Sequence, residues 1–169
     1  LNQTGNPNLW KNFLPDKLPL DKSLYGIVHI EAHDSAIPTI TEIRWLDTIL
    51  KSSPNLKYAH IAFIDITLPI HEFTNNIIQI KQYPQVKGIR HILSHHTRYK
   101  YSPCNEDLSL HKNILANLVC LKQNNLIFDC QMYPYQLNNI LPHIIQSGVS
   151  CVIDHFALPA WDNKNDHSL

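Results

Sequence analysis

The chain has 169 residues, of which 44% are hydrophobic and 17% charged, a balance that indicates a globular domain with its own core and excludes a disordered chain. Lysine plus arginine and aspartate plus glutamate each number 14, so the formal net charge is zero, which argues against binding to nucleic acid or to an anionic membrane. The 11 histidines are many for this length and favour a metal or acid–base site.

The cysteines and the lengths of the apolar runs indicate which cellular location and which kinds of site to expect. None of the four cysteines forms a C-x-x-C pair, which argues against structural zinc and favours a reducing, cytoplasmic location. No apolar run approaches the roughly 18 residues that a membrane span needs. We expect residues 1–169 to form a single domain, with 1–23 as a lead-in loop and 161–169 as a loose tail.

The first half of the chain predicts two strand–helix units. Residues 25–32 form the first predicted strand, and Thr39 with Glu42 has the form of a capping box that opens a helix to about residue 51. Residues 58–65 form the second strand, followed by a helix over 70–82. The apolar stripe expected on that helix is Phe73, Ile77, Ile78 and Ile80.

The next unit contains the third strand, residues 86–93, and a long polar and aromatic segment over 94–105. A loop of that length after a strand is more often functional than decorative. Residues 108–124 carry the strongest helical pattern in the chain. Its expected buried side consists of Leu110, Ile114, Leu118 and Leu121.

The last unit contains a strand over 127–132 and a helix over 136–147. Pro142 in the helix interior predicts a kink or a short first turn, and Gly148 suits its C-terminal stop. The fifth strand covers 151–155 and ends in Asp-His. Alternating strands and helices predict an α/β protein with a parallel sheet, either an open doubly wound sheet or part of a (β/α)8 barrel.

Two residues stand out as candidates for chemistry. His155 lies at the predicted end of the fifth strand, where it is either an acid–base or metal-ligating group or a satisfied strand-end histidine. Arg90 lies inside an apolar strand and must be paired, because an unpaired buried cation is too unfavourable to keep. Its partner is either a structural carboxylate or an anionic ligand such as a substrate carboxylate.

Further polar residues cluster at the same ends of the strands. Asp129, Gln131 and Tyr133 share one face of the fourth strand, and His29 and Glu31 share a face of the first. The second strand ends in Asp65. The sequence contains no glycine-rich phosphate loop, no G-x-S-x-G elbow and no H-x-H pair.

Together these stretches resemble the lactonase-like branch of the amidohydrolase superfamily, which includes 2-pyrone-4,6-dicarboxylate lactonase and fuconolactonase. The similarity covers nearly all of residues 20–160. It rests on VHIEA at 28–32, TEIRWL at 41–46, VKGIRHIL at 86–93, FDCQMYP at 128–134 and VIDH at 152–155, closed by Pro159.

The resemblance implies a (β/α)8 barrel that hydrolyses a lactone or related ester, with or without a divalent metal such as zinc or manganese. By motif, His155 matches a site histidine that polarises the carbonyl or ligates the metal, and Arg90 matches an arginine at the substrate end. Glu31, Asp129, Gln131 and Tyr133 are expected to line the substrate pocket.

Two parts of the family's site have no counterpart here. The family carries an H-x-H pair on its first barrel strand and an aspartate on its last, so the five strands of this incomplete chain would be barrel strands two to six. We therefore expect one of three functions: lactone hydrolysis, an inactive remnant or assembly module, or a small-molecule binding domain. The expected partners are a lactone or carboxylate-bearing ring and, at the open sheet edges, another copy or a completing chain.

Overall fold

A five-stranded parallel sheet organises the chain, whose computed structural model describes residues 25–32, 34, 36–51, 56–96 and 103–158. The strands are β1 (Gly26–Ile30), β2 (Lys57–Phe63), β3 (Val86–Ile92), β4 (Ile127–Gln131) and β5 (Cys151–Ile153). Each pairs in parallel with the next strand along the chain, in the order β1-β2-β3-β4-β5.

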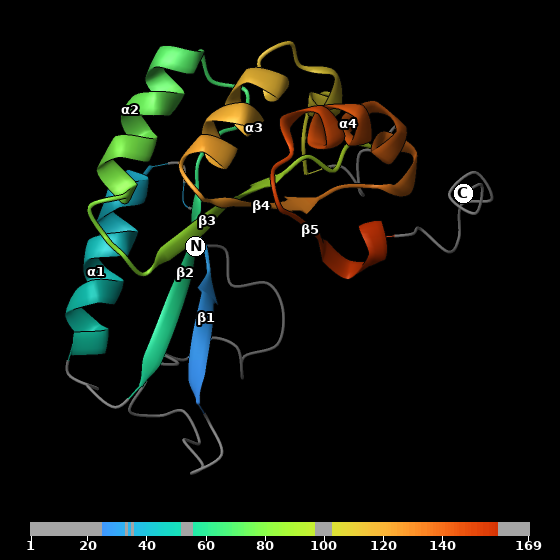
Figure 1. The fold of residues 1–169 in the computed structure, drawn as a ribbon. Helices are drawn as coiled ribbons and strands as arrows, with labels where there is room; N and C mark the ends of the chain where they lie inside the picture. Colours follow the sequence, from blue (N-terminus) through green and yellow to red (C-terminus); the bar gives the residue numbers. More distant parts are fainter. Residues whose placement is uncertain (1–24, 33, 35, 52–55, 97–102, 159–169) are drawn as a thin grey trace.

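This strand order decides between the two architectures that the sequence left open. A doubly wound sheet reverses direction at a switch point, whereas each connection here moves one strand onward in the same direction. The helices α1 (Thr39–Lys51), α2 (Ile70–Ile80), α3 (Ile114–Gln123) and α4 (Pro134–Ser147) lie along one side of the curved sheet (Figure 1). The expectation of a partial (β/α)8 barrel is therefore confirmed: the chain forms a half-barrel.

The core lies between the sheet and these helices. Ile89 on β3 and Phe128 on β4 are fully buried there, together with Phe73 of α2 and Leu118 of α3. Side chains alternate along a strand, so residues next to Ile89 and Phe128 face the opposite, concave side of the sheet. This alternation directs the polar residues of β3 and β4 toward the side where a barrel has its interior.

The predicted capping box at Thr39 is wrong, although the helix that it marks is present. The Thr39 hydroxyl donates to the Phe63 carbonyl of β2 at 2.8 Å, and Glu42 accepts the backbone N–H of Ala32 at 2.8 Å. Both side chains therefore reach neighbouring strands instead of the first turn of α1. Tertiary partners have replaced the local ones because the helix start lies against the strand ends.

The predicted helix over 108–124 begins later than expected. A short 3-10 helix, Leu108–Leu110, comes first, and α3 starts at Ile114. Asp107 accepts hydrogen bonds from the backbone and hydroxyl of Ser109, which stabilises this separate turn. Leu110 is consequently 67% exposed instead of buried. On α2, Ile78 is likewise exposed, while Phe73, Ile77 and Ile80 fill the core as expected.

The C-terminal helix agrees with the sequence in its special residues. Pro142 lies inside α4, and Gly148 ends the helix in a left-handed conformation with φ of 65°. The helix starts at Pro134, earlier than predicted, because proline suits the first helical position. The predicted lead-in loop 1–23, the tail 161–169 and residues 97–102 of the polar segment lie outside the described residues. Among the helices that the structure describes, none is long and apolar enough to cross a membrane.

Gly88 is required where β3 meets β4. A Cβ atom added there would lie 2.3 Å from Cγ1 and 2.6 Å from the carbonyl oxygen of Ile127. We expect Gly88→Ala to lower the free energy of unfolding by about 2–3 kcal/mol, because the paired strands must move apart. Urea denaturation measures this loss, and Gly148→Ala, which meets no atom within 4 Å, should lose only about 1 kcal/mol from its positive φ. A Gly88 variant as stable as the Gly148 variant would contradict the close packing.

Candidate functional site

Three charged side chains meet on the concave side of the sheet. Arg90 on β3 is directly opposite Asp129 on β4, and Asp154 follows the end of β5. The Arg90 Nε donates to Asp129 Oδ1 at 3.2 Å, and Nη2 donates to Asp154 Oδ2. All three side chains are at most 15% exposed. The partner of Arg90 is thus a pair of carboxylates of the chain itself, which is one of the two alternatives that the sequence allowed.

The two carboxylates share one arginine, and this shapes their protonation. Burial and a hydrogen bond with Asp154 raise the pKa of Asp129 to about 6, although Arg90 acts in the opposite direction. A carboxyl group with a pKa near neutrality can exchange a proton with a substrate or with water under ordinary conditions. The cluster on the concave side of the sheet therefore has acid–base capacity.

His155 does not lie on a strand as predicted. β5 ends at Ile153, and residues Asp154–Ala157 form a 3-10 turn in which His155 has φ of 52°. Positive φ continues through Phe156, Ala157 and Leu158, so the backbone turns left-handed directly after Asp154. His155 is exposed at the rim, next in the chain to the residue that holds Arg90. The alternation of side chains along β5 therefore does not extend to His155 and does not predict the direction of its ring.

The other predicted pocket residues are divided between two places. Gln131 ends β4 on the same face as Asp129, two residues farther along. Tyr133 lies beyond the strand, at the start of α4, where its buried ring makes an edge contact with His96 and stacks on Tyr135. Glu31 follows β1, and its backbone N–H donates to the Ile61 carbonyl. Glu31 thus lies at the first strand, three strands from Gln131.

Asp154 is a site residue that the sequence analysis placed on a strand without giving it a role. Its signal was present in the Asp-His ending, but only the chain fold shows that it reaches Arg90 two strands away. Two further residues, His60 and Gln136, had no feature in the sequence that marked them as structurally important. His60 is buried and touches His29, and Gln136 is fully buried below the segment after β3.

The histidine pair lies on the other side of the sheet, toward α1. The Nδ1 atoms of His29 and His60 are 3.0 Å apart, and Nε2 of His29 is 3.8 Å from the Glu42 carboxylate. Burial lowers the pKa of His29, and burial together with the neighbouring His29 ring lowers the pKa of His60 to about 4. Both rings are therefore neutral at pH 7.

A metal ion would need several ligating side chains in one place. Within the described ranges, no group of three or more histidine, cysteine, aspartate or glutamate side chains is arranged to hold one. Asp129 and Asp154 both pair with Arg90, so the cation between these two carboxylates is a side chain of the chain itself. These described residues do not fit a metal centre.

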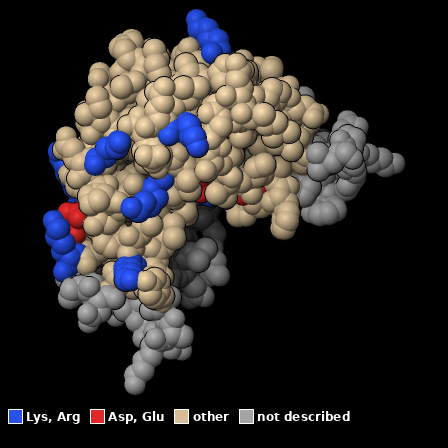
Figure 2. Space-filling view, in the orientation of Figure 1, with Lys and Arg blue, Asp and Glu red and all other residues tan. Residues whose placement is uncertain are grey.

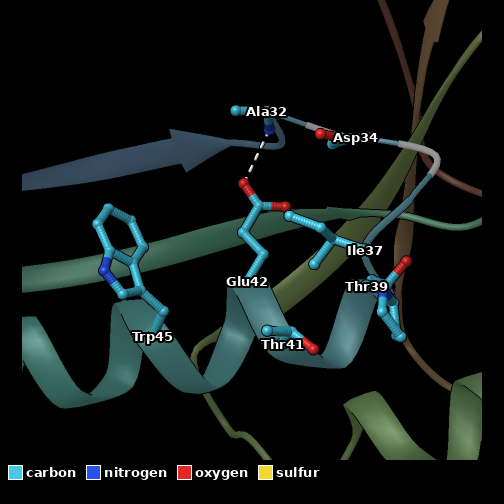
Figure 3. Close-up of a pocket in the computed structure, with 8 residues that line it drawn as sticks. Ala32, Asp34, Ile37, Thr39, Thr41, Glu42 and Trp45 are labelled. Carbon is cyan, nitrogen blue, oxygen red and sulfur yellow. Dashed lines mark hydrogen bonds between the residues drawn. The ribbon is translucent and has the colours of Figure 1, made fainter.

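A groove of about 360 Å³ lies at the start of α1, beside the segment that follows β1. Figure 3 shows Glu42 directed at the backbone nitrogen of Ala32, with Trp45 one turn farther along the same helix. Trp45 and Ile37 supply half-exposed apolar surface. None of the residues that line this groove belongs to the Arg90 cluster, so this groove and the charged cluster are separate features.

The surface charges are dispersed on the face that Figure 2 shows. Lysine and arginine side chains are spread over this face, with uncharged surface between most of them, and acidic atoms show beside the basic side chains at the left edge and near the central hollow.

Comparisons with known proteins support the fold. No family model matches the chain, and no curated protein matches it. An amidohydrolase from Burkholderia multivorans with bound zinc aligns with a TM-score of 0.65 and 18% identity, over 91% of this chain and 51% of its own. A structure of such an amidohydrolase from the same organism with bound HEPES aligns with a TM-score of 0.58 and 16% identity, over 83% and 45%. The chain therefore spans about half the length of the solved structures that it matches.

Proposed function

We propose that this chain is part of a lactonase-like barrel hydrolase of the amidohydrolase superfamily, which converts a lactone and water into a hydroxy acid. One observation carries the proposal: Arg90 of β3, Asp129 of β4 and Asp154 directly after β5 meet on the concave side of the sheet, and barrel enzymes hold their chemistry inside the barrel near the carboxyl ends of the strands. The fold likeness to an amidohydrolase and the motifs around Arg90 and His155 support it.

The roles follow from charge and position. Asp129, whose pKa of about 6 leaves it mostly ionised at pH 7.5, takes a proton from the attacking water. Arg90 holds that carboxylate and presents positive charge to a carbonyl oxygen or a substrate carboxylate. His155 at the rim polarises the ester carbonyl, and Gln131, on the same face of β4 as Asp129, lines the approach. Glu31 at the first strand and Tyr133 beside His96 lie apart from this approach. The water oxygen bonds to the carbonyl carbon, the ring C–O bond breaks, and Asp129 returns the proton to the ring oxygen, which leaves as the product hydroxyl.

Zinc is bound to the solved amidohydrolase, and a divalent metal such as zinc or manganese was expected from the family resemblance. The described residues do not form a group of metal ligands, so the proposed reaction uses only side chains of this chain. A metal would supply Lewis-acid polarisation of the carbonyl if further ligands came from outside the described residues, with His155 as the candidate ligand in this chain.

A non-catalytic assembly module is the second candidate. It is favoured by the pairing of Arg90 with two carboxylates of the chain, which gives its charge a structural role through Nε and Nη2. It is also favoured by the sheet edges, because β1 and β5 each pair with one strand in the described part of the chain. Another copy of the chain, or a completing chain, would cover those edges.

Proton release against a panel of sugar and pyrone-type lactones, with and without added zinc or manganese, tests the two candidates. For an enzyme we expect Asp129→Asn and His155→Ala each to lower kcat at least about 100-fold, because each removes a group that acts on the reacting atoms. The exposed helix residue His71 provides the control, and His71→Ala should leave kcat unchanged.

Circular dichroism on the same samples shows whether each variant is folded, and light scattering gives the oligomeric state. A folded wild-type chain that hydrolyses none of the lactones, alone or with metal, would contradict the hydrolase proposal and favour the assembly module. Hydrolysis that survives both site substitutions would assign the reaction to other residues.

A further inference from the structure

A histidine pair, with His60 buried and His29 partly exposed, joins the first two strands on the helix side of the sheet, away from the Arg90 cluster. His29 on β1 and His60 on β2 lie in register, with their Nδ1 atoms 3.0 Å apart and their ring centroids 4.9 Å apart. His60 is 2% exposed. β1 pairs only with β2 in the described residues, so this pair is part of the attachment of an edge strand.

The short contact between two nitrogen atoms fixes the number of protons. One Nδ1 must carry a hydrogen and the other must be bare, because two donors or two acceptors would repel at that distance. Nε2 of His29 points toward the Glu42 carboxylate, 3.8 Å away, which favours a hydrogen on that atom. His29 Nδ1 is then bare and accepts from His60 Nδ1, and His60 Nε2 is left bare.

An additional proton has no favourable position in this arrangement. On His29 Nδ1 it would face the hydrogen of His60, unless that hydrogen moved to His60 Nε2. His60 Nε2 is inaccessible to solvent and has no hydrogen-bond partner, so a hydrogen there is a buried donor without an acceptor, and an additional proton there creates a buried cation. Protonation of the pair therefore either separates the two rings, which belong to different strands, or leaves a buried N–H group of His60 without a partner.

We propose that His29, His60 and Glu42 form an acid-sensitive latch that holds edge strand β1 on the sheet at neutral pH and releases it on acidification. Glu42 contributes twice, because it lies beside His29 and also accepts the N–H of Ala32 just after β1. Helix α1 thus holds the end of β1 by the same side chain that orients the histidine pair.

The surrounding charges do not remove the dependence of the latch on pH. Glu42 and Glu31 favour a proton on His29, but the effect of burial is larger and in the opposite direction. Around His60, burial and the neighbouring His29 both disfavour the charged ring. The other titratable or charged groups near the pair are Asp47, Tyr58 and Tyr83, with Lys51 on Asp47 and Arg44 on Tyr83.

The direction of the pH effect follows from the lowered pKa values. A released or unfolded histidine titrates near pH 6.5, whereas the latched His60 titrates near pH 4, so the open form binds more protons between these values. Stability of the latch is complete above about pH 6.5 and is lost as the pH falls. Asp129 has the opposite dependence, since its raised pKa makes the folded form bind the extra proton. The latch is therefore measured locally at β1 and not from the melting temperature.

The experiment combines two NMR measurements on the 169-residue chain between pH 7 and pH 4.5. Ring nitrogen shifts should show His29 and His60 both neutral at pH 5.5, with one protonated and one bare Nδ1. Hydrogen-exchange protection factors of the β1 amides should fall about tenfold per pH unit below pH 6. His60→Phe should abolish that fall, and His71→Gln on the exposed face of α2 should preserve it.

Three results would overturn the latch. One is a second proton on either ring above pH 6 in the folded chain, and another is β1 protection that does not change with pH. The third is an unaltered pH dependence in a folded His60→Phe variant. If that variant does not fold, the two wild-type measurements decide by themselves.

Discussion

Replacing Arg90 by methionine should lower the free energy of unfolding by about 3–5 kcal/mol at pH 7.5. The substitution retains an apolar side chain of similar length but removes the cation between Asp129 and Asp154, whose side chains are only 6% and 14% exposed. Two buried carboxylates would then face each other without a counter-charge, which is far less favourable than the intact group. Urea denaturation followed by circular dichroism measures the difference.

The pH dependence identifies the cause of this loss. Without Arg90 the pKa of Asp129 should rise further, because Arg90 is the group that lowers it. The carboxyl group then becomes neutral at a higher pH, so the deficit of the variant should shrink between pH 7.5 and pH 5. Arg44→Met is the control, since Arg44 is exposed and its Nε donates to the Tyr83 hydroxyl at 3.4 Å. An equal loss in both variants, or a deficit that does not vary with pH, would show that Arg90 acts through packing alone.

Replacing Gln136 by methionine should lower the free energy of unfolding by at least about 3 kcal/mol, because several buried backbone groups would lose their partner at once. Its Oε1 accepts the N–H groups of His95 and Tyr133 at 3.2 and 3.1 Å. Its Nε2 donates to the Leu93 carbonyl at 2.9 Å and to Asp107 at 2.6 Å. This single amide therefore joins the segment after β3, the turn before α3 and the start of α4.

The same helix supplies the matched control for this prediction. Gln146 is exposed on α4, and Gln146→Met should change stability by less than about 0.5 kcal/mol. Thermal or urea unfolding of the two variants is a direct comparison, because both exchange an amide for a thioether on one helix. If Gln136→Met were as stable as Gln146→Met, the four hydrogen bonds would contribute nothing net, and the segment after β3 would be held by its other contacts.

The positions of the elements were readable from local patterns. Helix α1 matches its predicted bounds, and the predicted strands differ from β1 to β5 by at most three residues at an end. Apolar periodicity and the residues that end helices depend on neighbours along the chain, so they can be recognised in the sequence alone. Gly148 as the end of α4 is an example, because the left-handed conformation favours glycine in any context.

The predictions from the sequence were wrong where a side chain could bond either to a neighbour along the chain or to a distant residue. Thr39 and Glu42 have the spacing of a capping box, yet their bonds go to Phe63 and Ala32. The helical pattern over 108–124 did not reveal that Asp107 would form its own turn with Ser109. In both places the competing bond depends on geometry that a periodic pattern does not contain.

The sequence by itself determined an alternating parallel α/β chain and the need for Arg90 to be paired, because a cation in an apolar strand is unfavourable without a partner. Only the tertiary structure decided that the strands follow one another in a half-barrel and that Arg90 lies between Asp129 and Asp154. It also decided that His60 meets His29 below α1. These contacts join residues 31 to 64 positions apart, and such pairing is set by strand order and register, which local periodicity does not encode.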